Sequence, residues 1–120
     1  MDFALSDEQK QIREEVRRFA ENEVAPVAKE YDVAEKYPHE VMDKAAEMGM
    51  LGSIIPMEYG GAGYNNLESA IITEELFAVD PGIGLCITSA SFGAHAIMEY
   101  GTDDQKERFL SPIAEGEAIM

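Results

Sequence analysis

The fold is decided by residues 83–97, which read IGLCITSASFGAHAI. This stretch contains no Asp, Glu, Lys or Arg, although 28% of the whole chain is charged. A helix that is apolar or small around its whole circumference is normally enclosed by its neighbours. We therefore expect a central buried helix from about Leu85 to Tyr100, ended by Gly101, with other helices packed around it.

Two helices are predicted near the N-terminus. Residues 6–9, Ser-Asp-Glu-Gln, fit a capping box, and the helix that they open keeps one apolar stripe until Pro26 stops or kinks it. Residues 28–37 indicate a polar connection or a short extra turn. Pro38 fits the first position of a second helix, and Gly49 fits its end.

The later helices follow from similar signals. Asn65 or Asn66 can cap a third helix that runs from Leu67 to Val79, and residues 80–82, Asp-Pro-Gly, indicate a turn. Residues 102–105 form a second capping box, which opens a last helix that Pro112 breaks or restarts. No useful strand-like alternation occurs. We predict one all-α domain, a bundle of five to six helices.

Residues 50–66 are expected to be irregular, because Pro56 and several Gly and Asn residues disfavour regular structure. Connections of this length in compact domains are more often functional than idle. The glycines of residues 60–63 raise phosphate binding as a possible function. However, no Lys-Ser/Thr pair follows them and no strand precedes them, so neither a P-loop nor a dinucleotide loop is indicated. No cofactor-binding residue can be named from this pattern.

Charge sets limits on the partners. Nine Lys and Arg residues against 24 Asp and Glu residues leave a formal net charge of −15. Nucleic acids and anionic membranes are bound through clustered cations, so we expect neither as a partner. Such an acidic excess repels itself unless salt screens it. Adaptation to high salt and a merely well-solvated surface both remain open as interpretations.

The single cysteine, Cys86, excludes an internal disulfide, and its apolar surroundings predict a buried, inert thiol. Residues 1–4 lack the basic and then apolar pattern of a signal peptide. We find no run of about 18 apolar residues, the length of a membrane span. A cytoplasmic protein is the simplest interpretation.

No complete catalytic or metal site is visible in the sequence. His39, His95 and Cys86 match no metal-ligand spacing, so we predict no metal. Acidic pairs such as residues 74–75 do not face one another on a helix and are interpreted as solvated. Ser91 and His95 share a helix face, but a nucleophile elbow and an orienting acid are missing, so hydroxyls bonded to helix carbonyls are the preferred interpretation.

Several motifs in order resemble the acyl-CoA dehydrogenase family. Residues 3–9 look like its opening segment, and residues 52–63 contain its Pro-x-Glu-x-Gly-Gly-x-Gly loop. Residues 74–76 and 100–110 match its third and fifth helices, and residues 116–117 fit the segment that follows. Each motif alone is moderately specific, but the motifs occur in the family's order and together cover essentially the whole chain, so the set is strong.

The resemblance implies an N-terminal helical domain, residues 1–120, without the family's middle β domain and C-terminal helical domain. Family members carry FAD, remove two hydrogens from the α and β carbons of an acyl-CoA thioester, and pass electrons to an electron-transferring flavoprotein. They are usually tetramers, so a homo-oligomer is expected. The catalytic carboxylate and most flavin contacts come from the later domains, so no catalytic residue is assigned here and this stretch alone is expected to be inactive.

The same resemblance assigns the lining of the acyl-chain pocket to Thr88, Ser89 and Phe92. From chemistry alone, hydroxyls on an apolar helix can either shape a slot for an apolar chain or permit close helix packing. Phe92 would shorten such a slot and favour short or branched acyl chains. No Lys or Arg lies between Ile83 and Tyr100, and His95 is the only possible cation there, so a dicarboxylyl substrate of the glutaryl type is not expected.

Two other functions stay open at this stage. Acyl-CoA oxidases and flavin-dependent monooxygenases share the same helical domain, and their distinguishing features lie outside it. A helical interaction module without catalysis is the third possibility. For the isolated domain we expect no yellow colour and an exposed apolar surface that favours self-association.

Overall fold

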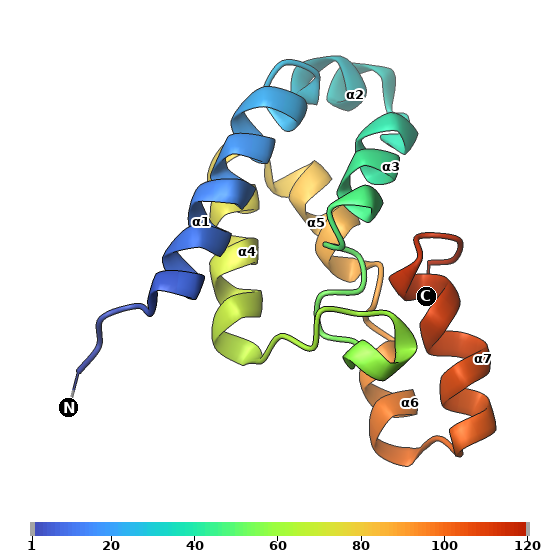
Figure 1. Ribbon diagram of the computed structural model, residues 1–120. Helices are drawn as coiled ribbons and strands as arrows, with labels where there is room; N and C mark the ends of the chain where they lie inside the picture. The colour runs from blue at the N-terminus through green and yellow to red at the C-terminus, as the bar shows by residue number, and fades with distance from the viewer. Residues whose placement is uncertain (1, 120) are drawn as a thin grey trace.

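The computed structural model describes residues 2–119, and within this range the chain contains helices and no strands (Figure 1). The all-α prediction is therefore confirmed. The α-helices are α1 (Asp7–Phe19), α2 (Ala28–Ala34), α3 (His39–Glu47), α4 (Asn66–Val79), α5 (Pro81–Ser89), α6 (Ala94–Tyr100) and α7 (Asp103–Ala114). A π-helical turn, Ala20–Val24, extends α1, and a 3-10 turn, Met57–Tyr59, interrupts the long loop.

The predicted helix starts are confirmed by their caps. At α1 the Ser6 hydroxyl accepts from the Gln9 N–H at 3.1 Å, while the Gln9 side chain accepts from the Ser6 N–H at 3.0 Å. Thr102 and Gln105 repeat this reciprocal pair at α7. Asn65 is the cap of α4, with its side chain bonded to the Leu67 N–H at 2.8 Å. These pairs satisfy N–H groups that a helix leaves open at its first turn.

Two predicted details near prolines need correction. Pro38 precedes α3 as its cap, with φ −83° and ψ 62°, and is not its first helical residue. Pro112 neither breaks nor restarts α7, which continues to Ala114. The predicted end of α3 near Gly49 is confirmed, because Gly49 follows the helix with a left-handed φ of +74° that suits glycine.

The predicted long helix from Leu85 to Tyr100 was wrong, because it is two helices joined by a turn at residues 90–93. The first of them begins earlier, at Pro81: the Asp80 side chain accepts from the Ile83 N–H at 2.7 Å and caps it. Residues 80–82 therefore start a helix and do not form a free turn. Ser and Gly are poor helix formers, and the break turns α6 toward α7.

The prediction that this segment is buried all round was also wrong. Ile83 and Ile87 are buried, but Leu85 is 49% exposed, Phe92 66% and Tyr100 85%. The shape of the domain explains why, since its dimensions are 42 × 41 × 19 Å. A flat arrangement of helices cannot enclose every side of one member, so one side of α5 and α6 has no cover within the described residues.

The apolar interior consists of two clusters. The larger cluster joins α1, α3, α4 and α5, and Leu76 and Ile87 are almost fully buried in it. The smaller cluster joins α6, α7 and the long loop through Ile55, Ala94 and Ile113. Figure 1 shows this division, with α6 and α7 beside the loop and apart from the α1–α4 pair. The turn at residues 90–93 connects the two clusters.

The segment Pro81–Tyr100 spans 20 residues and contains an 18-residue window with a mean hydropathy of 1.2, which is long and apolar enough to cross a membrane by length and composition. The expectation that no such run exists was therefore too strict. A core helix of a water-soluble domain meets the same criterion, and 33% of this window is buried in the domain. The turn at residues 90–93 divides the segment into two shorter helices.

Glu75 is not on a solvated face, contrary to the prediction for residues 74–75. It is 6% exposed and accepts two hydrogen bonds, each 2.8 Å long, from the Arg17 guanidinium. Arg13 lies 3.3 Å from the same carboxylate. Both arginines come from α1, so the carboxylate ties α1 to α4. The hydrogen bond and charge of Glu75 raise the pKa of Arg17 above its usual value.

Candidate functional site

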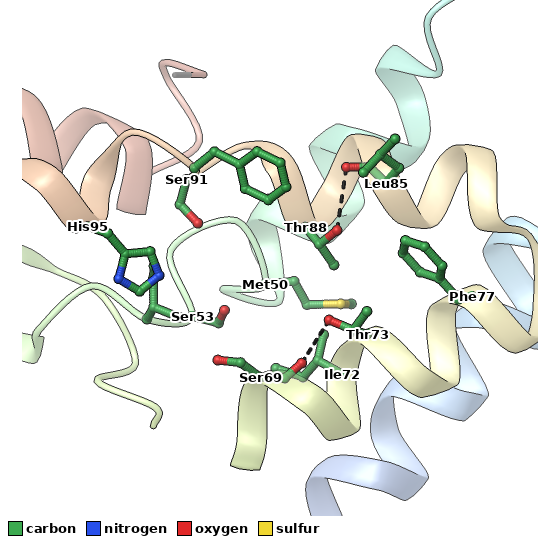
Figure 2. Close-up of a pocket in the computed structure, with 12 residues that line it drawn as sticks. Met50, Ser53, Ser69, Ile72, Thr73, Phe77, Leu85, Thr88, Ser91 and His95 are labelled. Atoms are coloured by element: carbon green, nitrogen blue, oxygen red, sulfur yellow. Dashed lines mark hydrogen bonds between the residues drawn. The ribbon is translucent and has the colours of Figure 1, made fainter. Parts of the chain in front are cut away.

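A cavity of about 300 Å³ lies between α4, α5 and the start of the long loop (Figure 2). This volume is at the lower end of the range for small-molecule pockets, roughly 300–1,000 Å³. The side chains that line it are apolar residues, serines and threonines, and one histidine. They are Met50, Ser53, Ile54, Ser69, Ile72, Thr73, Phe77, Leu85, Thr88, Ser91, Phe92 and His95.

Helical spacing brings the α4 and α5 side chains to the cavity. Ser69, Thr73 and Phe77 recur at intervals of four along α4 and so share one face. Leu85 and Thr88 are three residues apart on α5, on the side opposite the buried Ile87. Figure 2 shows Phe77 and Leu85 at one end of the group. The wall is thus built mainly from half-buried faces of α4 and α5, together with Ile72, which also belongs to the main core.

The long loop supplies the remaining wall, and glycine holds it in place. The Tyr64 N–H donates to the Ser53 carbonyl at 2.8 Å, and the Gly63 N–H donates to the Ile55 carbonyl at 2.8 Å. Gly61 lies so close to residue 55 that an added Cβ would be 2.0 Å from the Ile55 carbonyl oxygen. Only glycine allows this approach. The prediction that residues 50–66 form a functional loop is consistent with its position at the cavity.

The hydroxyl groups in the cavity differ in their bonding. Thr73 donates to the Ser69 carbonyl at 2.8 Å and Thr88 to the Gly84 carbonyl at 3.0 Å, as expected for hydroxyls in helices. The Ser69 hydroxyl oxygen is buried and has no hydrogen-bond partner within residues 2–119. The cavity can therefore enclose an apolar chain and still offers a hydrogen-bonding group.

Two of the three predicted pocket residues, Thr88 and Phe92, line this cavity. Ser89 does not line it; its hydroxyl lies 3.5 Å from the Cys86 carbonyl of the same helix. Their roles toward a substrate remain predictions. Sequence reasoning missed Ser53 and Ser69, because nothing in the local pattern tells which side of a loop or of α4 will meet α5.

Cys86 is half-buried, and burial raises the pKa of its thiol above the usual value. A raised pKa leaves less thiolate at neutral pH, so the thiol is a poor nucleophile and a poor metal ligand. Within residues 2–119 no group of three or more His, Cys, Asp or Glu side chains could hold a metal ion. The cavity itself contains no carboxylate that could act as a base.

The sequence pattern described as "Acyl-CoA dehydrogenase, N-terminal domain" matches residues 6–117. The chain belongs to the acyl-CoA dehydrogenase family. The resemblance first seen in the ordered motifs is thereby confirmed. The match extends over both apolar clusters and includes every residue that lines the cavity.

Relatives agree with this assignment. The short-chain specific acyl-CoA dehydrogenase of Clostridium acetobutylicum is 44% identical over 99% of this chain. The probable acyl-CoA dehydrogenase YngJ of Bacillus subtilis is 37% identical over the same share. The solved butyryl-CoA dehydrogenase of Megasphaera elsdenii has a TM-score of 0.87, 32% identity and 99% coverage of this acyl-CoA dehydrogenase domain. The chain covers 32% of the length of each of these three proteins.

Proposed function

We propose that this chain is the N-terminal helical domain of a flavoenzyme that α,β-dehydrogenates acyl-CoA thioesters, and that it provides one wall of the acyl-chain pocket. The cavity between α4 and α5 carries this proposal, because it is mostly apolar and its lining includes Thr88 and Phe92, two of the three residues that the resemblance assigns to the acyl-chain pocket. Thr88 and Phe92 contact the chain in this proposal, and Ser89 supports α5 from outside the cavity.

The described residues do not fit FAD by themselves. A dinucleotide needs a glycine-rich turn after a strand, or cations near its phosphates, and no Lys or Arg lines the cavity. The family resemblance implies that FAD and the catalytic carboxylate belong to a middle β domain and a C-terminal helical domain, and we propose the same arrangement for the full enzyme. The part of this chain is to bind and orient the acyl group and to exclude water from one side.

Partners are proposed on the same basis. One similar solved structure is described as the electron transferring flavoprotein of Acidaminococcus fermentans, studied for flavin-based electron bifurcation. A chain of that structure aligns with a TM-score of 0.90 and 39% identity. The alignment covers 99% of the present chain and 32% of the chain in that structure. We propose an acyl-CoA substrate, an electron-transferring flavoprotein as electron acceptor, and a homo-oligomer in the cytoplasm.

The opposite reaction direction is a second candidate. The acryloyl-CoA reductase (NADH) of Anaerotignum propionicum is 38% identical over 97% of this chain. The cavity residues would hold a saturated or an unsaturated acyl chain equally well, since their contacts are with the hydrocarbon. Assaying the full-length protein with butyryl-CoA plus a dye acceptor, and separately with crotonyl-CoA plus NADH, distinguishes the two directions.

The pocket assignment is tested by chain-length profiling of the full-length protein. Phe92→Ala should shift kcat/KM toward longer acyl-CoA substrates, because it removes a large side chain from the cavity. Tyr100→Ala is a matched control, since Tyr100 is an 85% exposed aromatic outside the cavity. An unchanged profile in Phe92→Ala would remove the pocket assignment. Turnover of glutaryl-CoA would contradict the expectation drawn from the absence of Lys and Arg.

A further inference from the structure

The Ser69 hydroxyl has no bonding role within the described chain. Its oxygen is buried and lacks a partner among residues 2–119, whereas the hydroxyls of Thr73 and Thr88 bond to carbonyls of their own helices. Buried hydroxyls are nearly always hydrogen-bonded, because leaving one unpaired destabilises the folded protein. The unpaired Ser69 hydroxyl should therefore destabilise the domain unless a ligand in the cavity forms a hydrogen bond with it.

Four polar side chains of the cavity are gathered at one end, while the hydroxyls of Thr73 and Thr88, which bond to carbonyls of their own helices, lie between that end and the apolar end (Figure 2). Figure 2 shows the hydroxyls of Ser53, Ser69 and Ser91 and the ring of His95 on one side, with Phe77 and Leu85 on the other. All of these residues line the same cavity. The cavity is therefore divided into a hydrocarbon-lined end and a hydroxyl-lined end.

The hydroxyl-lined end fits a neutral oxygen. Serine hydroxyls can both donate and accept, so they suit a hydroxyl or a carbonyl group. A carboxylate taken out of water needs a cation or several charge-assisted bonds. The lining contains no Lys or Arg and a single histidine, His95, so a neutral oxygen is the better match. A purely hydrocarbon chain would leave the Ser69 oxygen unpaired.

We propose that the preferred acyl group carries a second, neutral oxygen function, a hydroxyl or a ketone beyond the β carbon, which Ser69 and the adjacent serines bind. This specificity rests on the proposed acyl-CoA function. Ser69 then distinguishes an oxygen-bearing chain from a plain hydrocarbon chain of equal length, while Phe77 and Leu85 contact the hydrocarbon part.

Matched substrates test the inference in the full-length protein. Butyryl-, pentanoyl- and hexanoyl-CoA are each compared with their ω-hydroxy counterparts, both by kcat/KM and by titration calorimetry. In the natural sequence at least one ω-hydroxy compound should be preferred over its plain partner. Ser69→Ala should lower that preference about fivefold, which corresponds to the loss of one ordinary hydrogen bond.

Ser111→Ala is the matched control, because Ser111 is a half-buried helical serine outside the cavity. It should leave both the preference and the unfolding midpoint unchanged, whereas Ser69→Ala should keep or raise the midpoint without ligand, because it removes an unpaired buried hydroxyl. Preference for the plain chain in every pair, or an equal loss on both members of a pair in Ser69→Ala, would overturn the inference. If the protein oxidises none of these acyl-CoA compounds, the proposed dehydrogenation is wrong. The binding affinities from calorimetry, compared between the plain and ω-hydroxy compounds, still decide the role of Ser69.

Discussion

Replacing Gly61 with alanine should destabilise the domain more than its small size suggests. The new Cβ would be 2.0 Å from the Ile55 carbonyl oxygen and 2.6 Å from the Gly52 carbonyl oxygen. Both obstacles are backbone atoms, which cannot rotate away as a side chain can. Relief of the contact therefore requires the loop segments around residues 52–55 and 61–63 to separate.

The magnitude follows from the bonds that this separation breaks. They are the hydrogen bonds from the Gly61 N–H to the Pro56 carbonyl, from the Ala62 N–H to the Gly52 carbonyl and from the Gly63 N–H to the Ile55 carbonyl, at 3.2, 3.3 and 2.8 Å. Each contributes about 1 kcal/mol net, so we expect a loss of about 3 kcal/mol. Because the same bonds hold Ser53 and Ile54 at the cavity, acyl-CoA binding should weaken as well.

Urea denaturation followed by circular dichroism measures this loss. Gly49→Ala is the matched control, because an added Cβ there has nothing within 4 Å and meets only the penalty of its φ of +74°. That penalty is about 1–2 kcal/mol for a residue in the left-handed region. If Gly61→Ala costs no more than Gly49→Ala, the close approach at residue 61 does not hold the loop.

Two further predictions concern titratable groups. Cys86 should react with iodoacetamide at neutral pH more slowly than a free thiol, and its rate should rise only at higher pH, because burial raises its pKa; a rate equal to that of glutathione would contradict this. Arg17→Ala should lower the urea midpoint, more at low salt than at high salt, because it removes two 2.8 Å bonds to a buried carboxylate. Lys10→Ala, which removes an exposed 3.4 Å pair with Asp7, should leave the midpoint unchanged.

The acidic excess bears on how the domain meets its partners. The formal charge of −15 is carried outside the cavity, because the lining contains no carboxylate. Leu85 in α5 and Phe92 in the turn at residues 90–93 form an exposed apolar patch beside the cavity, which the acyl chain and the other domains would cover together in the proposed full enzyme. Its apolar character is typical of a surface that becomes covered in a larger assembly.

The sequence by itself determined the starts of α1, α4 and α7 and the end of α3. Capping boxes at Ser6 and Thr102 and the glycine at position 49 act within one turn of the chain, so they can be recognised without knowing the fold. The ordered motifs likewise identified the family, and the uncharged stretch 83–97 located the helices that line the cavity.

Only the tertiary structure decided which sides of those helices are covered. The break at residues 90–93, the exposure of Phe92 and the burial of Glu75 all depend on packing against segments distant in sequence. Glu75 is buried because α1 brings Arg17 to it across 58 positions of the chain. Ser69 faces the cavity because α4 meets α5 there. Local patterns carry no information about such partners, because packing and ion pairing depend on distance in space and not on distance along the chain.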